Sequence, residues 1–253
     1  MNISIYVNGK RVSAKQDENL LEVLKTNGFE VPALCYHKGL PSYGSCRLCT
    51  VEVKTGGRKR IIASCTYPVR EEGIEVFTES ARVNRLRNMI IKFLMARAPS
   101  ATEIQKLAKT YEIDKQKTGV DEEENSEEKC ILCGKCVRTC NDILQKHAIS
   151  FVNRGIDRKV APPFEEAPED CIGCSACVYV CPTGAITEKL ENNTKHIKPW
   201  EAEHKLVRCP ECNKVFMPQE TIDEVASKLE PVDSSSTLCL DCRRKQAVKK
   251  LDF

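Results

Sequence analysis

Two runs of four cysteines lie between Cys130 and Cys181, and both have the spacing C-x2-C-x2-C-x3-C. A cubane iron–sulfur cluster needs four converging thiolates, and the two-residue gaps let three of them wrap one side. Where two such runs occur together, the fourth cysteine of each run ligates the other cluster. We therefore predict two [4Fe–4S] clusters, one held by Cys130, Cys133, Cys136 and Cys181 and the other by Cys140, Cys171, Cys174 and Cys177. A pair of zinc sites is the alternative, which the three-residue fourth gap and Pro182 disfavour.

A second cysteine group precedes these runs and consists of Cys35, Cys46, Cys49 and Cys65. Gly39 and Gly44 lie between the first two cysteines and would let the backbone pass close to cluster sulfides. We predict that these four thiolates hold a [2Fe–2S] cluster, with zinc as the alternative because the spacing departs from C-x4-C-x2-C. His37 is interpreted as a non-ligand, since a Rieske cluster needs two histidines and no second one is nearby.

The last cysteine group has two C-x2-C pairs, Cys209 with Cys212 and Cys239 with Cys242. Two such pairs suit tetrahedral zinc, in which four thiolates close the coordination shell and replace a missing core. We predict a structural zinc in a zinc-ribbon-like module. A single iron of the rubredoxin type or a further iron–sulfur cluster is the alternative. His204 is interpreted as a surface residue, because four thiolates already suffice.

The elements that must position the first group follow from periodicity and turn residues. Ile3, Ile5 and Val7 alternate with polar residues before the turn Asn8-Gly9, which predicts a hairpin that returns over residues 11–14. A helix is predicted from about Leu20 to Gly28, a second hairpin over residues 50–63 and a strand over residues 73–78. This order predicts a β-grasp domain.

Two helices are predicted between the β-grasp domain and the cubane region. Residues 81–97 have helical periodicity, with Arg82, Arg85 and Arg87 assigned to a charged face that is solvated or docks a partner. Pro99 ends this helix, and Ser100 with Glu103 has the spacing of a capping box for the next one. Residues 121–129 are predicted to be an acidic linker.

The fold class predicted for the whole chain is α+β and modular. The predicted domains are a β-grasp [2Fe–2S] domain over residues 1–80, a helical connector with linker over 81–125, a 2[4Fe–4S] ferredoxin domain over 126–190 and the zinc module over 200–253. Within the ferredoxin domain, residues 148–153 and 183–187 are predicted to be matching strands. A helix near residues 220–229 and a basic terminal helix are predicted in the zinc module.

Composition limits the class of protein. The sequence has 253 residues, 16 cysteines and a net charge of only +3, so charge does not indicate nucleic acid or anionic membrane as the partner. The start has no secretory signal pattern, and no run approaches the roughly 20 apolar residues of a membrane span. Reduced, metal-bound thiolates and a cytoplasmic location are the expectation.

The module order, the string CILCGKCVRTC at residues 130–140 and the string AISFVNRG at residues 148–155 resemble a known family. Over about residues 1–190 the chain is similar to the iron–sulfur subunits of NADH-linked hydrogenases, formate dehydrogenases and the large peripheral subunit of respiratory complex I. The resemblance implies that the two-iron cluster exchanges electrons with a flavin-containing, NAD-reactive partner and that the cubanes carry them onward. A further cubane that many relatives hold with one histidine and three cysteines is not expected here, because residues 66–129 contain neither residue type.

The resulting functional prediction is a non-catalytic electron-transfer subunit of an NAD(P)H-linked oxidoreductase complex, and electron bifurcation is one use of such a relay. Its expected partners are a flavin- and NAD(P)-binding subunit and a further catalytic redox subunit. No dinucleotide fingerprint or Walker loop indicates a nucleotide site in the chain itself. The alternatives are a structural iron–sulfur and zinc protein that binds nucleic acid, and a self-contained iron–sulfur reductase.

Overall fold

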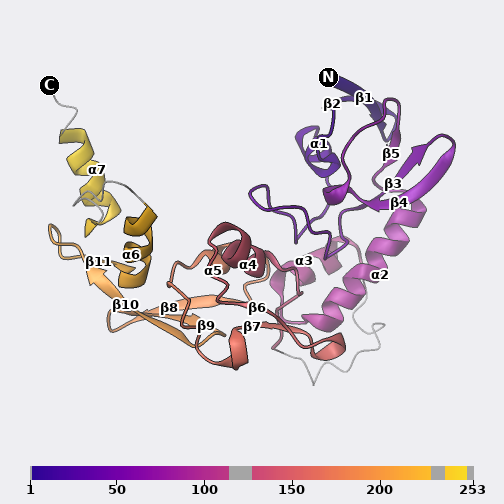
Figure 1. Cartoon of the computed structure of the whole chain (residues 1–253). Helices are drawn as coiled ribbons and strands as arrows, with labels where there is room; N and C mark the ends of the chain where they lie inside the picture. Colours follow the sequence, from indigo (N-terminus) through magenta and orange to yellow (C-terminus); the bar gives the residue numbers. More distant parts are fainter. Residues whose placement is uncertain (1, 114–126, 229–236, 250–253) are drawn as a thin grey trace. The chain divides into compact units, whose positions relative to one another are not determined.

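A computed structural model describes residues 2–113, 127–228 and 237–249, drawn in colour in Figure 1. The chain divides into two compact units. One comprises residues 1–135 and 182–185, and the other comprises residues 136–181 and 186–253. No helix of the described part is both long and apolar enough to cross a membrane.

The first unit is built on a five-stranded mixed sheet. Its order is β2-β1-β5-β3-β4, with β1 parallel to β5 and every other neighbouring pair antiparallel. The strands are β1 (Asn2–Val7), β2 (Lys10–Lys15), β3 (Thr50–Thr55), β4 (Arg58–Ala63) and β5 (Glu75–Phe77). The two predicted hairpins and the later strand are confirmed, and their mixed order is that of a β-grasp sheet.

Helix α1 (Leu20–Thr26) packs its apolar residues against this sheet. Its N-cap is Asn19, whose side chain accepts a hydrogen bond from the Leu21 amide at 3.0 Å. Gly28 follows the helix with a φ of +78°, a backbone conformation that favours glycine. The core beneath α1 includes Ile5, Leu20 and Val51, none of which has any exposed surface.

Two helices complete the first unit, α2 (Ala81–Arg97) and α3 (Thr102–Thr110), and they lie close together in Figure 1. The predicted capping box at Ser100 is wrong, because α3 begins after Ala101, whose side chain cannot accept a hydrogen bond. The assignment of Arg87 to a solvated face is also wrong. Its side chain is 1% exposed, whereas Arg82 and Arg85 lie at the surface as predicted.

The second unit begins within α4 (Lys135–Arg138), which continues into the π-helical turn η3 (Thr139–Ile143). Strand β6 (Ser150–Val152) pairs with β7 (Lys159–Ala161), and α5 (Ala176–Val180) follows. The prediction that residues 183–187 supply the strand matching 148–153 is wrong. The partner of β6 is β7, which the intervening connection brings back beside it.

A four-stranded antiparallel sheet, β11-β10-β9-β8, forms the rest of the second unit together with two helices. These elements are β8 (Thr187–Glu191), β9 (Thr194–Lys198), β10 (Ala202–Arg208), β11 (Val215–Pro218), α6 (Gln219–Lys228) and α7 (Leu240–Lys249). The predicted helices near residues 220–229 and at the basic end are thus present as α6 and α7. Most of the predicted acidic linker, residues 121–126, lies outside the described residues.

Candidate metal centres

The β-grasp cysteines are brought together and buried. Cys35, Cys46, Cys49 and Cys65 are each at most 4% exposed. Hydrogen bonds from the thiols of Cys46 and Cys65 lower the pKa of Cys35, and bonding to the Cys35 thiol raises the pKa of both donors. A hydrogen bond from Cys65 also lowers the pKa of Cys49, to about 6. Four buried sulfurs that share protons in this way have the chemistry of a site in which metal replaces the protons.

The loop that carries these cysteines is shaped by close backbone contacts. The backbone amides of Ser45 and Cys46 hydrogen-bond the Cys35 thiol. Gly44 has a φ of +70°, and a Cβ placed on it would lie 3.1 Å from Cγ2 of Thr66. The glycine therefore permits a close approach to Thr66 that a side chain would obstruct, while the predicted approach of Gly39 and Gly44 to cluster sulfides stays a prediction.

The neighbouring histidine does not join the cysteines. His37 is exposed, and its Nδ1 accepts a hydrogen bond from the Gly39 amide at 3.2 Å. This contact stays within the loop, and its exposure places His37 at the surface, while its role as a non-ligand stays a prediction.

In the second unit, four cysteines line one apolar cavity. They are the four assigned to the second cubane, Cys140, Cys171, Cys174 and Cys177, and Ile149, Ile197 and Trp200 are among the other residues of the wall. Burial raises the pKa of the Cys140 and Cys171 thiols and raises that of Cys177 to about 12. Cys140 comes from η3 and the other three from the later run, so the cavity brings together the crossed set.

The loop that contains Cys171 and Cys174 is held by side chains from β8, β9 and α6. Lys195 donates to the Gly173 carbonyl at 3.1 Å and to the Ser175 hydroxyl at 2.8 Å. Glu188 bonds the same hydroxyl, and Thr221 donates to the carbonyl of Ile172. These contacts fix the backbone between the two cysteines, and sequence patterns did not reveal them because the partners are 13 to 49 residues apart.

The interpretation of His204 as a surface residue is wrong. The side chain is 5% exposed on β10, and its Nδ1 lies 3.4 Å from Oε1 of Glu220. A Cβ on Gly173 would lie 2.7 Å from His204 Cγ, so the imidazole packs directly against the cysteine loop. It supports this loop, and among the described residues it is not part of the terminal four-thiol group.

The cysteines assigned to the first cubane are divided between the two units. Cys130 and Cys133 belong to the first unit, and Cys136 and Cys181 to the second. Cys133 and Cys136 are buried, while Cys130 and Cys181 are partly exposed. Within the first unit, the Ser45 hydroxyl donates to the Leu132 carbonyl at 3.1 Å, which links the β-grasp cysteine loop to the beginning of the first run.

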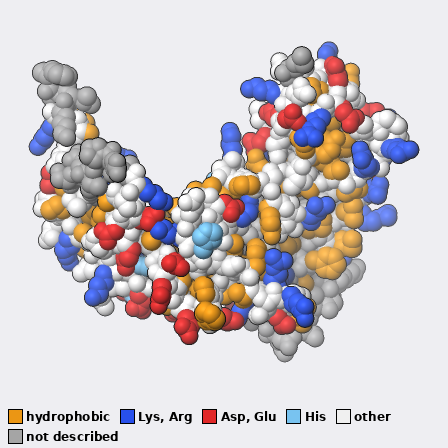
Figure 2. Space-filling view, in the orientation of Figure 1, with side chains coloured by type: hydrophobic (Ala, Val, Ile, Leu, Met, Phe, Trp, Pro, Cys, Tyr) orange, Lys and Arg blue, Asp and Glu red, His pale blue; other side chains and the backbone are white. Residues whose placement is uncertain are grey.

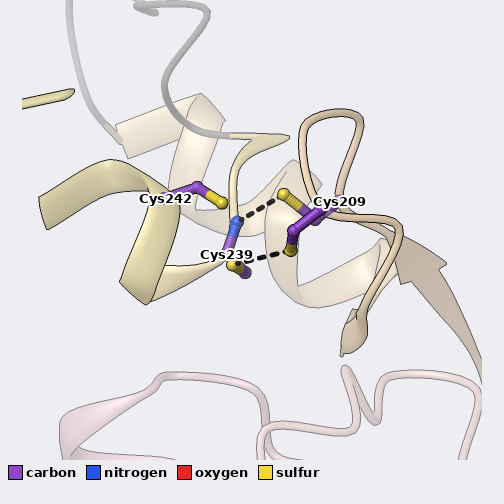
Figure 3. Close-up of side chains that lie close together, drawn as sticks. Cys209, Cys239 and Cys242 are labelled. Atoms are coloured by element: carbon purple, nitrogen blue, oxygen red, sulfur yellow. Dashed lines mark hydrogen bonds between the residues drawn. The ribbon is translucent and has the colours of Figure 1, made fainter. Parts of the chain in front are cut away.

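The terminal group forms a compact four-thiol site. The sulfur atoms of Cys209, Cys212, Cys239 and Cys242 all lie within 4.8 Å of one another. The first pair follows β10 in a tight turn in which the Asn213 amide donates to the Cys209 carbonyl at 2.8 Å, and the second pair opens α7. Figure 3 shows Cys209, Cys239 and Cys242 converging, with the Cys239 amide 3.5 Å from the Cys209 sulfur. This hydrogen bond, together with those from the Cys212 and Glu211 amides and the Cys212 thiol, lowers the pKa of Cys209 to about 6, which favours the thiolate form that binds metal.

Comparison with known proteins identifies two domains. Residues 1–81 match the family described as a 2Fe-2S iron-sulfur cluster binding domain, and residues 129–185 match the 4Fe-4S dicluster domain. The NADP-reducing hydrogenase subunit HndD of Solidesulfovibrio fructosivorans is 32% identical over 216 residues, which is 74% of this chain and 36% of that protein. The chain is similar to this hydrogenase subunit over 74% of its own length. The expected resemblance is thereby confirmed.

Two further relatives are similar over the same share of this chain. NADPH-Fe(3+) oxidoreductase subunit alpha of Geobacter sulfurreducens is 28% identical, covering 74% of this chain and 24% of its own length. The NADH-ubiquinone oxidoreductase 75 kDa subunit of Reclinomonas americana is 26% identical, covering 74% and 29% respectively. This chain therefore spans about a quarter to a third of the length of these curated relatives.

The fold also resembles a solved structure. A chain in the crystal structure of an NAD+-reducing [NiFe]-hydrogenase superimposes with a TM-score of 0.61 and 24% identity, covering 78% of this chain and 88% of that one. This similarity supports the arrangement of elements and no further property.

Proposed function

We propose that the chain is an electron-transfer subunit that relays electrons through one two-iron and two four-iron clusters. The observation that carries the proposal is that cysteine thiols gather in separate groups of four, within one domain that matches a 2Fe-2S family and another that matches a 4Fe-4S dicluster family. The relatives named above are subunits of hydrogenases and of NAD(P)H-linked oxidoreductases. They give no support to the nucleic-acid alternative or to a self-contained reductase.

In this proposal the two-iron ligands are Cys35, Cys46, Cys49 and Cys65, and the cubane ligands are the crossed sets predicted from sequence. The buried, proton-sharing thiols support the first assignment. The shared apolar cavity supports the assignment of Cys140 with Cys171, Cys174 and Cys177. A bound cluster supplies reversible one-electron chemistry, while the protein sets its potential through hydrogen bonds, burial and local charge.

The terminal thiols are proposed to hold a structural zinc. Four sulfur ligands leave no open coordination position, which is typical of structural rather than catalytic zinc. Among the residues that the structure describes, no histidine or carboxylate joins the four-thiol group. The zinc would therefore stabilise the fold and take no part in electron transfer.

The proposed partners are a flavin- and NAD(P)-binding subunit and a second redox subunit, in a cytoplasmic complex. Support comes from relatives whose names identify them as subunits of NADP- and NADPH-linked enzymes. On the face shown in Figure 2, basic and acidic side chains both occur on each unit, as the small net charge of +3 suggests. Charge alone therefore does not select the docking surface.

The proposal is tested by metal analysis and low-temperature EPR of the full chain reconstituted anaerobically. We expect about ten irons and one zinc, with reversible reduction by dithionite and no substrate turnover by the isolated chain. Cys140→Ser should alter a cubane signal and leave the two-iron signal unchanged. About fourteen irons without zinc would place another cubane at the terminal cysteines, and clusters that cannot be reduced would contradict the electron-transfer role.

A further inference from the structure

A buried arginine lies beside the β-grasp cysteine loop. Arg87 projects from α2, and its side chain is 1% exposed. Burying a charged group is costly unless hydrogen bonds and an opposite charge compensate it. The groups around this guanidinium must therefore offset the cost of its burial.

Hydrogen bonding satisfies the guanidinium group, and no carboxylate of the described residues forms an ion pair with it. Its nitrogens donate to the carbonyls of Leu48 at 3.2 Å, Thr50 at 2.8 Å and Thr78 at 3.3 Å. They also donate to the Tyr111 hydroxyl at 3.0 Å. All four acceptors are neutral. The ion pairs formed by the described residues do not include Arg87, and the buried carboxylate on the adjacent strand, Glu52, lies 3.8 Å from Arg82 instead.

Two of the four acceptors of Arg87 lie next to a proposed cluster ligand. Leu48 and Thr50 are the residues immediately before and after Cys49. The Leu48 amide also hydrogen-bonds the Cys46 thiol, so Leu48 contacts Arg87 through its carbonyl and a ligand sulfur through its amide. Arg87 therefore fixes the backbone on both sides of one proposed ligand and contacts a residue bonded to another.

A four-thiolate iron–sulfur cluster carries net negative charge, and one-electron reduction adds one more negative charge. A nearby buried cation stabilises the more negative state, because few water molecules are present to screen the interaction. We propose that Arg87 is a positioning residue of the two-iron site whose buried charge raises the cluster's reduction potential. This inference rests on the proposed function, because it requires a two-iron cluster at the β-grasp cysteines.

The test compares three variants of the full reconstituted chain. Arg87→Gln removes the charge and keeps hydrogen-bond donors, whereas Arg87→Lys keeps the charge and loses the planar fork. Arg85→Gln is the matched control, since Arg85 is exposed on the same helix and its replacement changes the net charge equally. The readouts are iron content, the two-iron EPR signal and its midpoint potential in a redox titration.

We expect Arg87→Gln to lower the equilibrium constant for reduction about tenfold, which corresponds to about 59 mV for a one-electron couple. Arg87→Lys should retain most of the wild-type potential, and Arg85→Gln should shift it by less than a third as much. An Arg87→Gln chain with a full cluster and an unchanged potential would overturn the inference. So would loss of the two-iron signal in both Arg87 variants, because the arginine would then be only a structural requirement. A wild-type chain without a two-iron signal would instead refute the proposed function.

Discussion

The β-grasp cysteine site and the terminal cysteine site both bring four thiols together, but their surroundings differ. The β-grasp site adjoins a core in which Ile5, Leu20, Val51 and many other apolar side chains are buried. In the terminal cluster, three of the four buried residues that the structure describes are cysteines, with Leu238 as the fourth and Phe216 partly buried against them. We therefore expect the first region to fold around its apolar side chains and the second to depend on the metal proposed for its thiols.

The largest expected effect is the loss of the terminal fold when the proposed zinc is removed. Cys239→Ser should abolish zinc binding and unfold residues 209–214 and α7, because structural zinc contributes about 10 kcal/mol or more to small domains. Hydrogen exchange measured by mass spectrometry would show the loss of protection. The matched control, Cys49→Ser, should lose the two-iron cluster but retain protection in β1 and β3. Equal loss of protection at both sites would contradict the comparison.

A smaller effect is expected from weakening the β-grasp core. Leu20→Ala should lower the free energy of unfolding of the β-grasp sheet by about 2–5 kcal/mol, since Leu20 is fully buried and its truncation leaves a cavity. Urea titration followed by hydrogen exchange in β1 and β3 measures this change. Met89→Ala is the control, because Met89 is 47% exposed. A Leu20→Ala chain as stable as the control would show that the cluster, rather than the core, maintains this sheet.

The smallest effect is expected at the cap of α1. Asn19 accepts from the Leu21 amide, and its Nδ2 donates to the Cys65 carbonyl at 2.6 Å. Asn19→Ala should lower the free energy of unfolding by about 1 kcal/mol, the usual contribution of an N-cap. Asn19→Asp keeps the cap acceptor and removes the donor to Cys65, so it should recover most of this loss in the same urea titration. If Asn19→Asp restores neither the stability nor the two-iron content, the contact with the Cys65 carbonyl, rather than the cap, is the important one.

Much of the fold could be predicted because local patterns specify it. Asn8-Gly9 and Gly56-Gly57 mark the two hairpins, and the helical periodicity of residues 81–97 coincides with α2. The pairing of strands that are far apart in the sequence was harder to predict. Residues 159–161, rather than 183–187, pair with β6, because a three-residue strand carries little pattern and its partner is chosen by the path of the connection.

By itself, the sequence determined the three cysteine groups, the β-grasp order and the relation to iron–sulfur subunits, because thiol spacing and turn residues act over short stretches of chain. Only the tertiary structure decided the environments of Arg87 and His204. Both side chains are polar and resembled surface residues in the sequence, yet they are 1% and 5% exposed. Burial depends on which distant elements pack together, and that packing places one beside the Cys49 loop and the other against Gly173.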